Sequence, residues 1–477
     1  MPQSISEYEI HADQLLKDCK MFPRDLMVCL KRLRSFCRPY LALLPRKEMR
    51  QHGRKCLKGL LSDLERKSAE PMAEFAGEDR QPLQYFMGAS PWDHRVLLRE
   101  LCAHVKKRIG EANGVLVIDP STFPKKGEHS VGVARQWCGR LGKVDNCQKG
   151  IFLGYVTNRG HTLVDERLYL PKEWTQKKTR REECHIPPEI KYKSAHKLAL
   201  EMVRERGEQI PHRWVVADDE FGVTGWFRRA LRGLGERYVL EIPSTLGVRD
   251  LRAPLPIQKP GRHRPTQVPF VSVKAWKESV EPSQWKRFEI RAGTQGPLVV
   301  WAAMTPVKTR IDGRVSKKAE WLLVTRTESK EPEVRYYLSH GGEEKQIGEM
   351  IHAANARHWV EDSFQQAKGE TGMDHYEVRS WLGWHHHITL SLLALWFLVL
   401  EQKRFNKKTP AMTVQQSAEA RGELLHEPGV NLRRLADKLT RRLRRSEQAR
   451  IDHWRKYKCL PPVWSVVRSL HVANFRQ

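Results

Sequence analysis

The chain has 477 residues, a formal net charge of +28 at pH 7 and 40% hydrophobic residues. Its length exceeds that of one ordinary domain, so we expect several segments around a sizeable buried core. The basic excess predicts a polyanionic partner, because Lys and Arg neutralise phosphates and release condensed counterions. The composition argues against a membrane protein, since no uninterrupted apolar stretch reaches the roughly 18 residues that a bilayer span requires.

Residues 1–107 predict a helical domain for DNA binding or assembly. They contain Leu- and Arg-rich stretches such as DLMVCLKRLRSF, with apolar residues at three- and four-residue steps. The cations of this part form either a DNA-contacting surface or an ordinary solvated helix face. They are Arg32, Arg34, Arg38, Arg46, Lys47 and Arg50. The amino terminus, MPQSISEYEIHADQ, lacks the layout of a secretory signal, which predicts a cytoplasmic protein.

Residues 108–245 predict the first part of an α/β core. The apolar runs GVLVID, GIFLGYV, TLVDERLYL, RWVVAD and RYVLEI have the length and the composition of strands. Helical stretches such as AHKLALEMVRERG separate the later runs. Three successive strands followed by alternating helices and strands indicate a mixed sheet covered by helices.

Residues 246–347 predict a β-rich insertion into that core. Four prolines open the segment, and the strand-like runs PFVSVKAW, RFEIRA, PLVVWAAM, AEWLLVTRT and VRYYLSH follow them. Trp301 and Trp321 lie in two of these runs, where core packing is favoured over stacking on a DNA base.

Residues 348–400 return to helix and are expected to complete the core. Their apolar stretch ITLSLLALWFLVL is too short for a bilayer span and predicts a buried core helix. Residues 401–477 predict a basic helical tail, with the cluster RRLRR at 441–445. This tail either contacts DNA or has no specific role.

Cysteines and histidines suggest two possible metal sites, and neither is favoured. The nine cysteines contain no C-x-x-C pair, which predicts reduced core thiols. Cys138 and Cys147 flank a basic segment but lack the second ligand pair that a zinc site needs. The run of His385, His386 and His387 precedes an apolar stretch, and a helix start with polar contacts is the preferred interpretation.

Two aspartates follow predicted strands of the α/β core. Asp119 ends the run GVLVID and Asp218 ends the run RWVVAD. An Asp at the carboxyl end of a strand can point into the crevice where ligands of α/β folds bind. Turns and helix caps use Asp in the same place, so capping is the stronger interpretation for either residue alone.

A third carboxylate, Glu361, lies on the helix predicted after the β-rich insertion. Arg357, Glu361 and Lys368 stand at i, i+4 and i+11, which places them on one stripe of the helix. An exposed Arg–Glu pair would have the same spacing. Three carboxylates that meet in the fold would hold hard divalent ions, Mg²⁺ or Mn²⁺. Two such ions about 4 Å apart would support an in-line displacement at phosphorus.

A basic, Gly-containing segment follows Asp119 and could line a DNA channel. Its cations include Lys125, Lys126 and Arg135, with Arg140, Lys143 and Lys149 further on. Glycines let the backbone approach a phosphate while the cations neutralise it. A solvated basic loop is the alternative.

The stretches VIDPSTFPKKGEHSVGVARQWCGRLGKVDNCQKG, RWVVADDEFG and ARHWVEDSFQQAKGETGMDHYEVRSWLGWHHHITL together resemble bacterial insertion-sequence transposases of the DDE class, in the branch with a β-rich insertion. The upstream stretch CLKGLLSDLERKSAEPMAEF is also similar to that group, so the resemblance reaches from the amino-terminal region to about residue 400. It implies an RNase H-like core, a two-metal mechanism, and Asp119, Asp218 and Glu361 as catalytic and metal-binding residues. The neighbours Asp219, Glu220 and Asp362 are less favoured.

The same resemblance implies that Arg357 and Lys368 belong to a signature of Tyr, two residues, Arg, three residues, Glu, six residues and Lys. Ala354 occupies the Tyr position here. The expected activity is cleavage of element ends and their joining to target DNA, by a homodimer in the bacterial cytoplasm at the nucleoid. The alternatives are a structure-specific DNA endonuclease of the same fold and a non-catalytic DNA-binding regulator.

Overall fold

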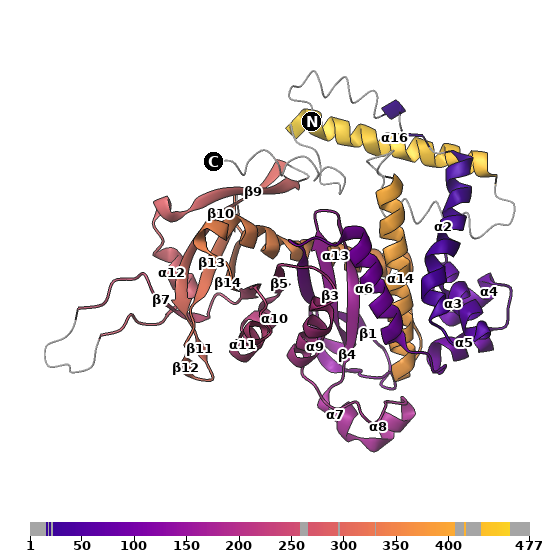
Figure 1. Cartoon of the computed structure of the whole chain (residues 1–477), viewed down its shortest axis with the longest axis horizontal. Coiled ribbons are helices and arrows are strands. Elements are labelled where there is room, and N and C mark those ends of the chain that lie inside the picture. The colour runs from indigo at the N-terminus through magenta and orange to yellow at the C-terminus, as the bar shows by residue number, and fades with distance from the viewer. Residues whose placement is uncertain are drawn as a thin grey trace.

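The computed structural model describes residues 16–17, 19–20, 22–257, 266–293, 296–329, 331–405, 415 and 431–457. The amino-terminal part consists of helices that lie beside the central sheet (Figure 1). They are α2 (Pro23–Ala42), α3 (Lys47–Leu60), α4 (Ala69–Phe75), α5 (Arg80–Gly88) and α6 (His94–Ile109). Their apolar faces join the main hydrophobic core, so this helical part is packed onto the rest of the protein.

The central sheet begins with three successive antiparallel pairings. Its first strands are β1 (Val115–Pro124), β2 (Ala134–Cys138), β3 (Lys143–Thr157) and β4 (Gly160–Tyr169). Strand β3 pairs antiparallel with β1, β2 and β4, whereas β5 (Trp214–Ala217) pairs parallel with β1, and β6 (Tyr238–Ile242) pairs parallel with β5. The predicted mixed sheet flanked by helices is thereby confirmed.

Helices connect the strands of the core and cover the sheet. They are α7 (Lys172–Gln176), α8 (Lys178–Glu183), α9 (Ala195–Gly207), α10 (Asp219–Gly222) and α11 (Gly225–Gly233). Helix α9 packs against β3 and β4. Helix α9 begins at an N-cap serine, Ser194, whose hydroxyl accepts a hydrogen bond from the amide of Lys197.

The segment of the predicted β-rich insertion continues the same sheet. It contains β7 (Gly247–Asp250), β8 (Val271–Ser272), α12 (Val273–Glu278), η1 (Pro282–Gln284), β9 (Lys286–Gly293), β10 (Gly296–Lys308), β11 (Arg310–Ile311), β12 (Arg314–Val315), β13 (Glu320–Thr327), β14 (Val334–His340) and η2 (Glu344–Gln346). Strand β14 pairs antiparallel with β6, so over the described residues one sheet of twelve strands runs from the core into this segment. The domain boundaries stay a prediction.

One expected strand of this segment is mostly helix. Within PFVSVKAW, only Val271 and Ser272 form a strand, and α12 begins at Val273. The reason is local, because the Ser272 hydroxyl accepts a hydrogen bond from the amide of Ala275 and so caps the helix. A second hydrophobic cluster, which includes Trp276, Val307 and Leu338, lies beneath this part of the sheet.

Two long helices complete the core. Helix α13 (Ile347–Thr371) packs on β1, β3, β4 and β5, and α14 (Trp381–Phe405) lies between the sheet and the amino-terminal helices (Figure 1). Residues Trp381–Arg404 are long and apolar enough to cross a membrane by length and composition, contrary to the sequence-based expectation. Because 94% of the most apolar window is buried, α14 is a core helix, as predicted.

In the basic tail, residues 401–405 form the end of α14, and a separate helix, α16, spans Leu432–Tyr457. Its apolar residues Leu435, Leu439 and Leu443 are buried, and it packs against α2. The cluster RRLRR therefore belongs to a docked helix in which Leu443 faces inward.

Gly154 allows α13 to approach β3 closely. A Cβ at this position would lie 2.4 Å from Cγ2 of Val360, which stands next to Glu361. We expect Gly154→Ala to lower the free energy of unfolding by about 1 to 3 kcal/mol, because the helix must move to relieve the clash. Urea denaturation measures this change. Gly127→Ala is the control, since nothing lies within 4 Å of its Cβ, and an equal loss there would contradict the explanation.

Candidate active site and comparisons

Strand register brings Asp119 and Asp218 to the same level of the sheet. In the parallel pairing of β1 with β5, Ile118 is opposite Ala217, and each aspartate is the next residue. Asp119 does not end its strand, contrary to expectation, because β1 continues to Pro124 through its pairing with β3. It stands instead where the parallel pairing with β5 ends, so both carboxylates occupy the carboxyl edge of that strand pair.

Capping does not explain Asp119, which lies within a strand. Asp218 stands at the N-cap position of α10, but its side chain accepts no capping hydrogen bond of standard geometry. The Oδ1 atom of Asp218 is buried and has no hydrogen-bond partner. A buried, unpartnered carboxylate oxygen carries a desolvation cost, which a ligand at this site would offset.

Arg357 of α13 joins the carboxylates of the site. Its Nη2 lies 3.6 Å from Asp119 and 3.5 Å from Glu361, and its Nη1 lies 2.8 Å from Glu241. The Arg357 side chain is 20% exposed, whereas that of Glu361 is 58% exposed. The Arg357–Glu361 pair, predicted from its i, i+4 spacing, therefore belongs to a cluster that also includes Asp119 of β1 and Glu241 of β6.

Sequence reasoning missed Glu241. In the pairing of β5 with β6, Ala217 is opposite Leu240, so Glu241 stands at the level of Asp218 on the next strand. A glutamate inside the apolar run RYVLEI was the available signal. Glu241 anchors Arg357 and is the carboxylate closest to it.

At the candidate site, several carboxylates share one contacting cation, Arg357. Burial raises the pKa of Asp119 to about 7, with Asp218 and Glu361 adding to the rise and Arg357 opposing it. Burial also raises the pKa of Asp218 to about 6, again against the influence of Arg357. Closely spaced carboxylates that ionise reluctantly are suited to a divalent cation, which restores the ionised form. The three predicted ligands thus fit a hard divalent ion chemically.

The raised pKa of Asp119 predicts how stability depends on pH. A carboxyl group with a higher pKa in the folded state binds more protons there, so the free energy of unfolding falls as pH rises from about 4 to about 7. Asn does not ionise, so we expect Asp119→Asn to remove this pH dependence. At pH 8 without divalent ions, we expect the variant to have a free energy of unfolding higher than the wild type by on the order of 2 kcal/mol. Urea denaturation in EDTA at several pH values measures the difference between the two proteins. Parallel curves for the wild type and the variant would contradict the prediction.

The predicted DNA-contacting cations differ in their surroundings. Lys126 and Arg135 are exposed. Lys125 instead lies 3.7 Å from the ring centroid of Tyr376 and donates a hydrogen bond to the Tyr376 carbonyl, and burial lowers its pKa to about 8. Lys368 is also half-buried, over the rings of Phe123 and Phe364. Their contacts with DNA stay predictions.

Four further cations from the predicted DNA-contacting sets form ion pairs. Lys149 lies 2.6 Å from Glu220, and Lys143 lies 3.0 Å from Asp145. Arg140 pairs with Asp374, and Arg32 of the amino-terminal helices binds Glu401. Arg32 therefore joins α2 to α14 through an ion pair, which neither a DNA-contacting surface nor a solvated helix face had predicted.

Other candidates from the sequence are packed in the interior. Cys138 and Cys147 are buried free thiols, and Cys138 donates a hydrogen bond to Thr122. Ala354, at the position of the signature Tyr, is buried in the main core. Trp301 packs against the second hydrophobic cluster, and the Arg252 guanidinium lies 5.6 Å from the ring centroid of Trp321. The buried thiols agree with the predicted reduced core cysteines, and the contacts of Trp301 agree with its predicted packing role.

The profile of a known family matches residues 39–297, which is more than half of the chain. The description of that family is "DDE superfamily endonuclease". The chain belongs to this family. The matched part of this DDE-family chain contains Asp119 and Asp218 and ends before Glu361. The predicted membership is confirmed, while the roles of the three carboxylates stay predictions.

A curated relative supports the same membership. The DDE-family chain is 26% identical over 370 residues to a protein of Microchaete diplosiphon described as a "probable transposase for insertion sequence element IS701". The aligned part covers 75% of this chain and 84% of the relative. Among solved structures, the NurA nuclease from Sulfolobus solfataricus matches 55% of this chain and 79% of its own, with 12% identity. Its TM-score of 0.23 is too low to support a structural conclusion.

Proposed function

We propose that this protein is a DNA transposase that cleaves the ends of an insertion sequence and joins them to target DNA. The observation that carries the proposal is the meeting of Asp119 and Asp218, from adjacent parallel strands, with Glu361 of α13 around Arg357. The family match and the transposase relative supply the class of reaction. The net charge of +28 fits a partner that is double-stranded DNA.

The strand order supports an RNase H-like core. The first part of the sheet has the order β4-β3-β1-β5-β6, and β3 alone runs antiparallel to the other four strands. In this arrangement β1, β5 and β6 run in the same direction, and Asp119, Asp218 and Glu241 stand at one level, directly after the last paired residues of β1 with β5 and of β5 with β6. Helix α13 adds Glu361 from the side of the sheet.

In the proposed mechanism, Asp119, Asp218 and Glu361 hold two Mg²⁺ or Mn²⁺ ions. When bound, the ions supply the activation of the attacking water or 3′-hydroxyl and the stabilisation of the leaving oxygen. Arg357 is anchored by Glu241 beside these carboxylates, where it neutralises the phosphate of the DNA. Lys368 stands two helical turns after Glu361 and extends the cationic stripe along α13. Lys125, Lys126 and Arg135 contact the DNA further along the first strands.

The test uses DNA ends taken from the sequence that flanks the gene, where inverted repeats and a short target duplication define the element. We expect labelled ends to be cut at the element boundary and joined to a plasmid in Mg²⁺, and neither product to form in EDTA. The proposed assembly is a homodimer that holds two ends in the bacterial cytoplasm. Cleavage that requires two DNA ends in the same reaction would support the homodimer. Efficient cleavage of DNA that carries a single end would contradict it.

The family description also favours a second candidate, a structure-specific DNA endonuclease that does not join ends. Ends supplied with a recessed 3′-hydroxyl, already cut, distinguish the two. Joining of such ends to a target in Mg²⁺ supports the transposase. Cutting of branched DNA together with an absence of joining would replace the transposase proposal with the nuclease.

A further inference from the structure

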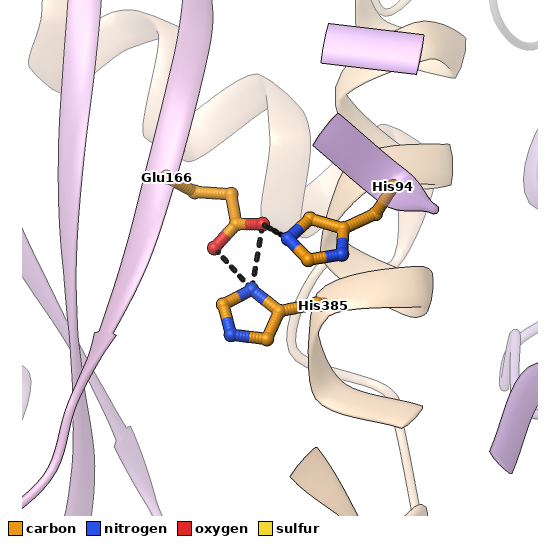
Figure 2. A group of neighbouring side chains, drawn as sticks. All are labelled: His94, Glu166 and His385. Atoms are coloured by element: carbon orange, nitrogen blue, oxygen red, sulfur yellow. Dashed lines mark hydrogen bonds and ion pairs between the residues drawn. The ribbon is translucent and has the colours of Figure 1, made fainter. Parts of the chain in front are cut away.

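His94, Glu166 and His385 form a second group of potential metal ligands, apart from the three carboxylates. The residues come from α6, β4 and α14, and their side chains converge on one point (Figure 2). Their ligand atoms all lie within 4.8 Å of one another, and all three residues are buried. Parts of the chain far apart in sequence thus meet at this cluster.

Distances within the cluster match those between ligands of one ion. His385 Nδ1 lies 2.9 Å from both carboxylate oxygens of Glu166, and His94 Nε2 lies 3.9 Å from Oε1. The two imidazole rings are stacked, with centroids 4.4 Å apart and planes 16° apart. Ligands about 2.0 to 2.2 Å from a tetrahedral zinc ion are roughly 3.3 Å from one another, so small shifts would complete such a site.

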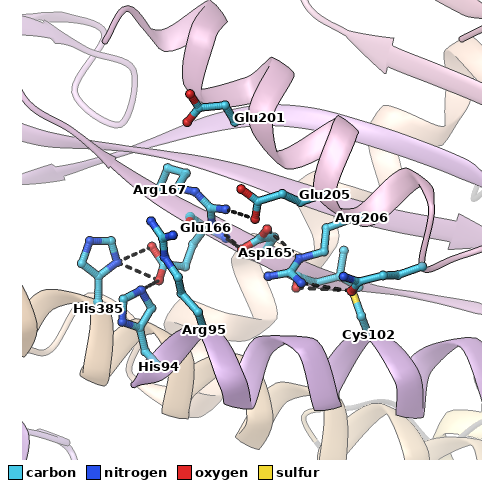
Figure 3. A network of polar contacts seen from close by, with 12 residues as sticks. His94, Arg95, Cys102, Asp165, Glu166, Arg167, Glu201, Glu205, Arg206 and His385 are labelled. Carbon is cyan, nitrogen blue, oxygen red and sulfur yellow. Dashed lines mark hydrogen bonds and ion pairs between the residues drawn. The ribbon is translucent and has the colours of Figure 1, made fainter. Parts of the chain in front are cut away.

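Among the described residues Glu166 forms no salt bridge with a Lys or Arg, although Arg167, Arg95 and Arg206 act on its carboxylate from further away. The neighbouring Arg167 pairs with Asp165 at 2.7 Å and with Glu205 at 2.8 Å, on the opposite face of β4 (Figure 3). Arg206 also binds Asp165, at 2.8 Å. The Glu166 side chain is fully buried, and its carboxylate pairs with the imidazoles of His94 and His385. A buried carboxylate needs compensation, which a divalent ion between it and two neutral imidazoles provides.

We propose that His94, Glu166 and His385 bind one Zn²⁺ ion that fastens α6 and α14 to the central sheet. Two imidazoles and one carboxylate form a donor set that zinc accepts, with water as the fourth ligand. Carboxylates and water alone, as expected at Asp119, Asp218 and Glu361, suit Mg²⁺ instead. The protein would therefore hold two kinds of metal site.

Strand register shows how this zinc site relates to the candidate active site. Asp119 of β1 and Glu166 of β4 are both opposite Phe152 of β3, so the three side chains point to the same face of the sheet. Two strand spacings, about 10 Å, separate the backbones of Asp119 and Glu166. Phe152 therefore stands between Asp119 and Glu166 on the face of the sheet that carries both proposed metal sites.

The test measures zinc content and its effect on the intact protein. We expect about one equivalent of zinc by elemental analysis after purification without chelators from zinc-supplemented cells. Removal of zinc with dipicolinate is expected to lower the melting temperature by about 5 °C or more, and added Zn²⁺ to restore it. Co²⁺ in place of Zn²⁺ is expected to give the visible absorption of a tetrahedral ion.

Variants identify the ligands. Glu166→Gln keeps the shape of the side chain and His385→Asn keeps a polar group, and each is expected to lose the zinc and the response to chelator. The matched control is His387→Gln, a buried histidine of the same helix that contacts the Gly372 carbonyl outside the cluster, which is expected to retain zinc. A chain with Asp119→Asn and Glu361→Gln is also expected to retain it. Less than a tenth of an equivalent in the wild type, or full zinc in folded Glu166→Gln, would overturn the proposal.

Discussion

Replacing any one carboxylate of the candidate active site is expected to abolish DNA cleavage. Asp119→Asn, Asp218→Asn and Glu361→Gln each remove a negative charge from the proposed metal site while keeping nearly the same shape. Because the three carboxylates would hold the ions that activate the nucleophile and stabilise the leaving oxygen, we expect the rate to fall by at least about 1,000-fold. Single-turnover cleavage of labelled element ends in Mg²⁺ measures the rate. Binding of the same DNA, followed by gel shift in EDTA, is expected to change by less than about threefold.

Neighbouring acidic residues provide matched controls for these variants. Asp219 follows Asp218 directly and is exposed, and Asp362 follows Glu361 and accepts a hydrogen bond from Gln366. Asp219→Asn and Asp362→Asn change the same charge close to the site, and we expect both to retain cleavage within about threefold. A loss at Asp362 with normal cleavage by Glu361→Gln would transfer the assignment to the neighbour.

Breaking the buried ion pair of Arg228 with Glu320 is expected to cause the largest loss of stability. Both side chains are 0% exposed, and the Nε of Arg228 lies 2.8 Å from the carboxylate. Glu320 also accepts a hydrogen bond from the Tyr238 hydroxyl. Glu320→Leu leaves a guanidinium buried without its counter-charge, so we expect the free energy of unfolding to fall by about 3 to 5 kcal/mol. Urea denaturation at pH 7 measures the loss.

Two further variants separate the missing counter-charge from the change of shape. The double variant Arg228→Met with Glu320→Leu removes both charges of this pair and is expected to recover much of the lost stability. Arg232, which lies 3.4 Å from Glu320 in the wild type, keeps its hydrogen bond to the Tyr238 hydroxyl. Arg229 lies next to Arg228 on α11 and forms an exposed ion pair with Asp312. We expect Arg229→Ala to change the free energy of unfolding by no more than about 0.5 kcal/mol. A double variant as unstable as Glu320→Leu alone would show that packing, and not the unpaired charge, causes the effect.

Much of the fold was predictable because strands and helices here follow their local patterns. The runs GVLVID, RWVVAD and RYVLEI form β1, β5 and β6, and the long proline-free stretch after residue 346 forms α13. The pattern failed at Val273, where an N-cap serine outweighed the strand-like residues that follow it. The continuation of the sheet through β14 and β6 was not predictable, because strand pairing across about a hundred residues depends on tertiary packing.

The residues of the candidate site could be named from the sequence, but their connections could not. Asp119 and Asp218 were found by their places after apolar runs, Glu361 by its helical spacing with Arg357 and Lys368, and all three by a resemblance. The role of Glu241 as the anchor of Arg357 depends on strand register, which one sequence does not reveal. Lys125 shows the opposite case, since a cation in a Gly-containing basic segment turned out to pack over Tyr376.

The central position of α14 has a consequence for synthesis of the protein. Helices α3, α5 and α6 pack against α14, yet about 300 residues separate α5 from α14 in the chain. At about 5 to 20 residues per second, a ribosome needs on the order of 15 to 60 seconds to bridge that interval. During this time the apolar faces of the first helices lack their permanent neighbour. The nascent chain is therefore expected to depend on chaperones until its last quarter has emerged.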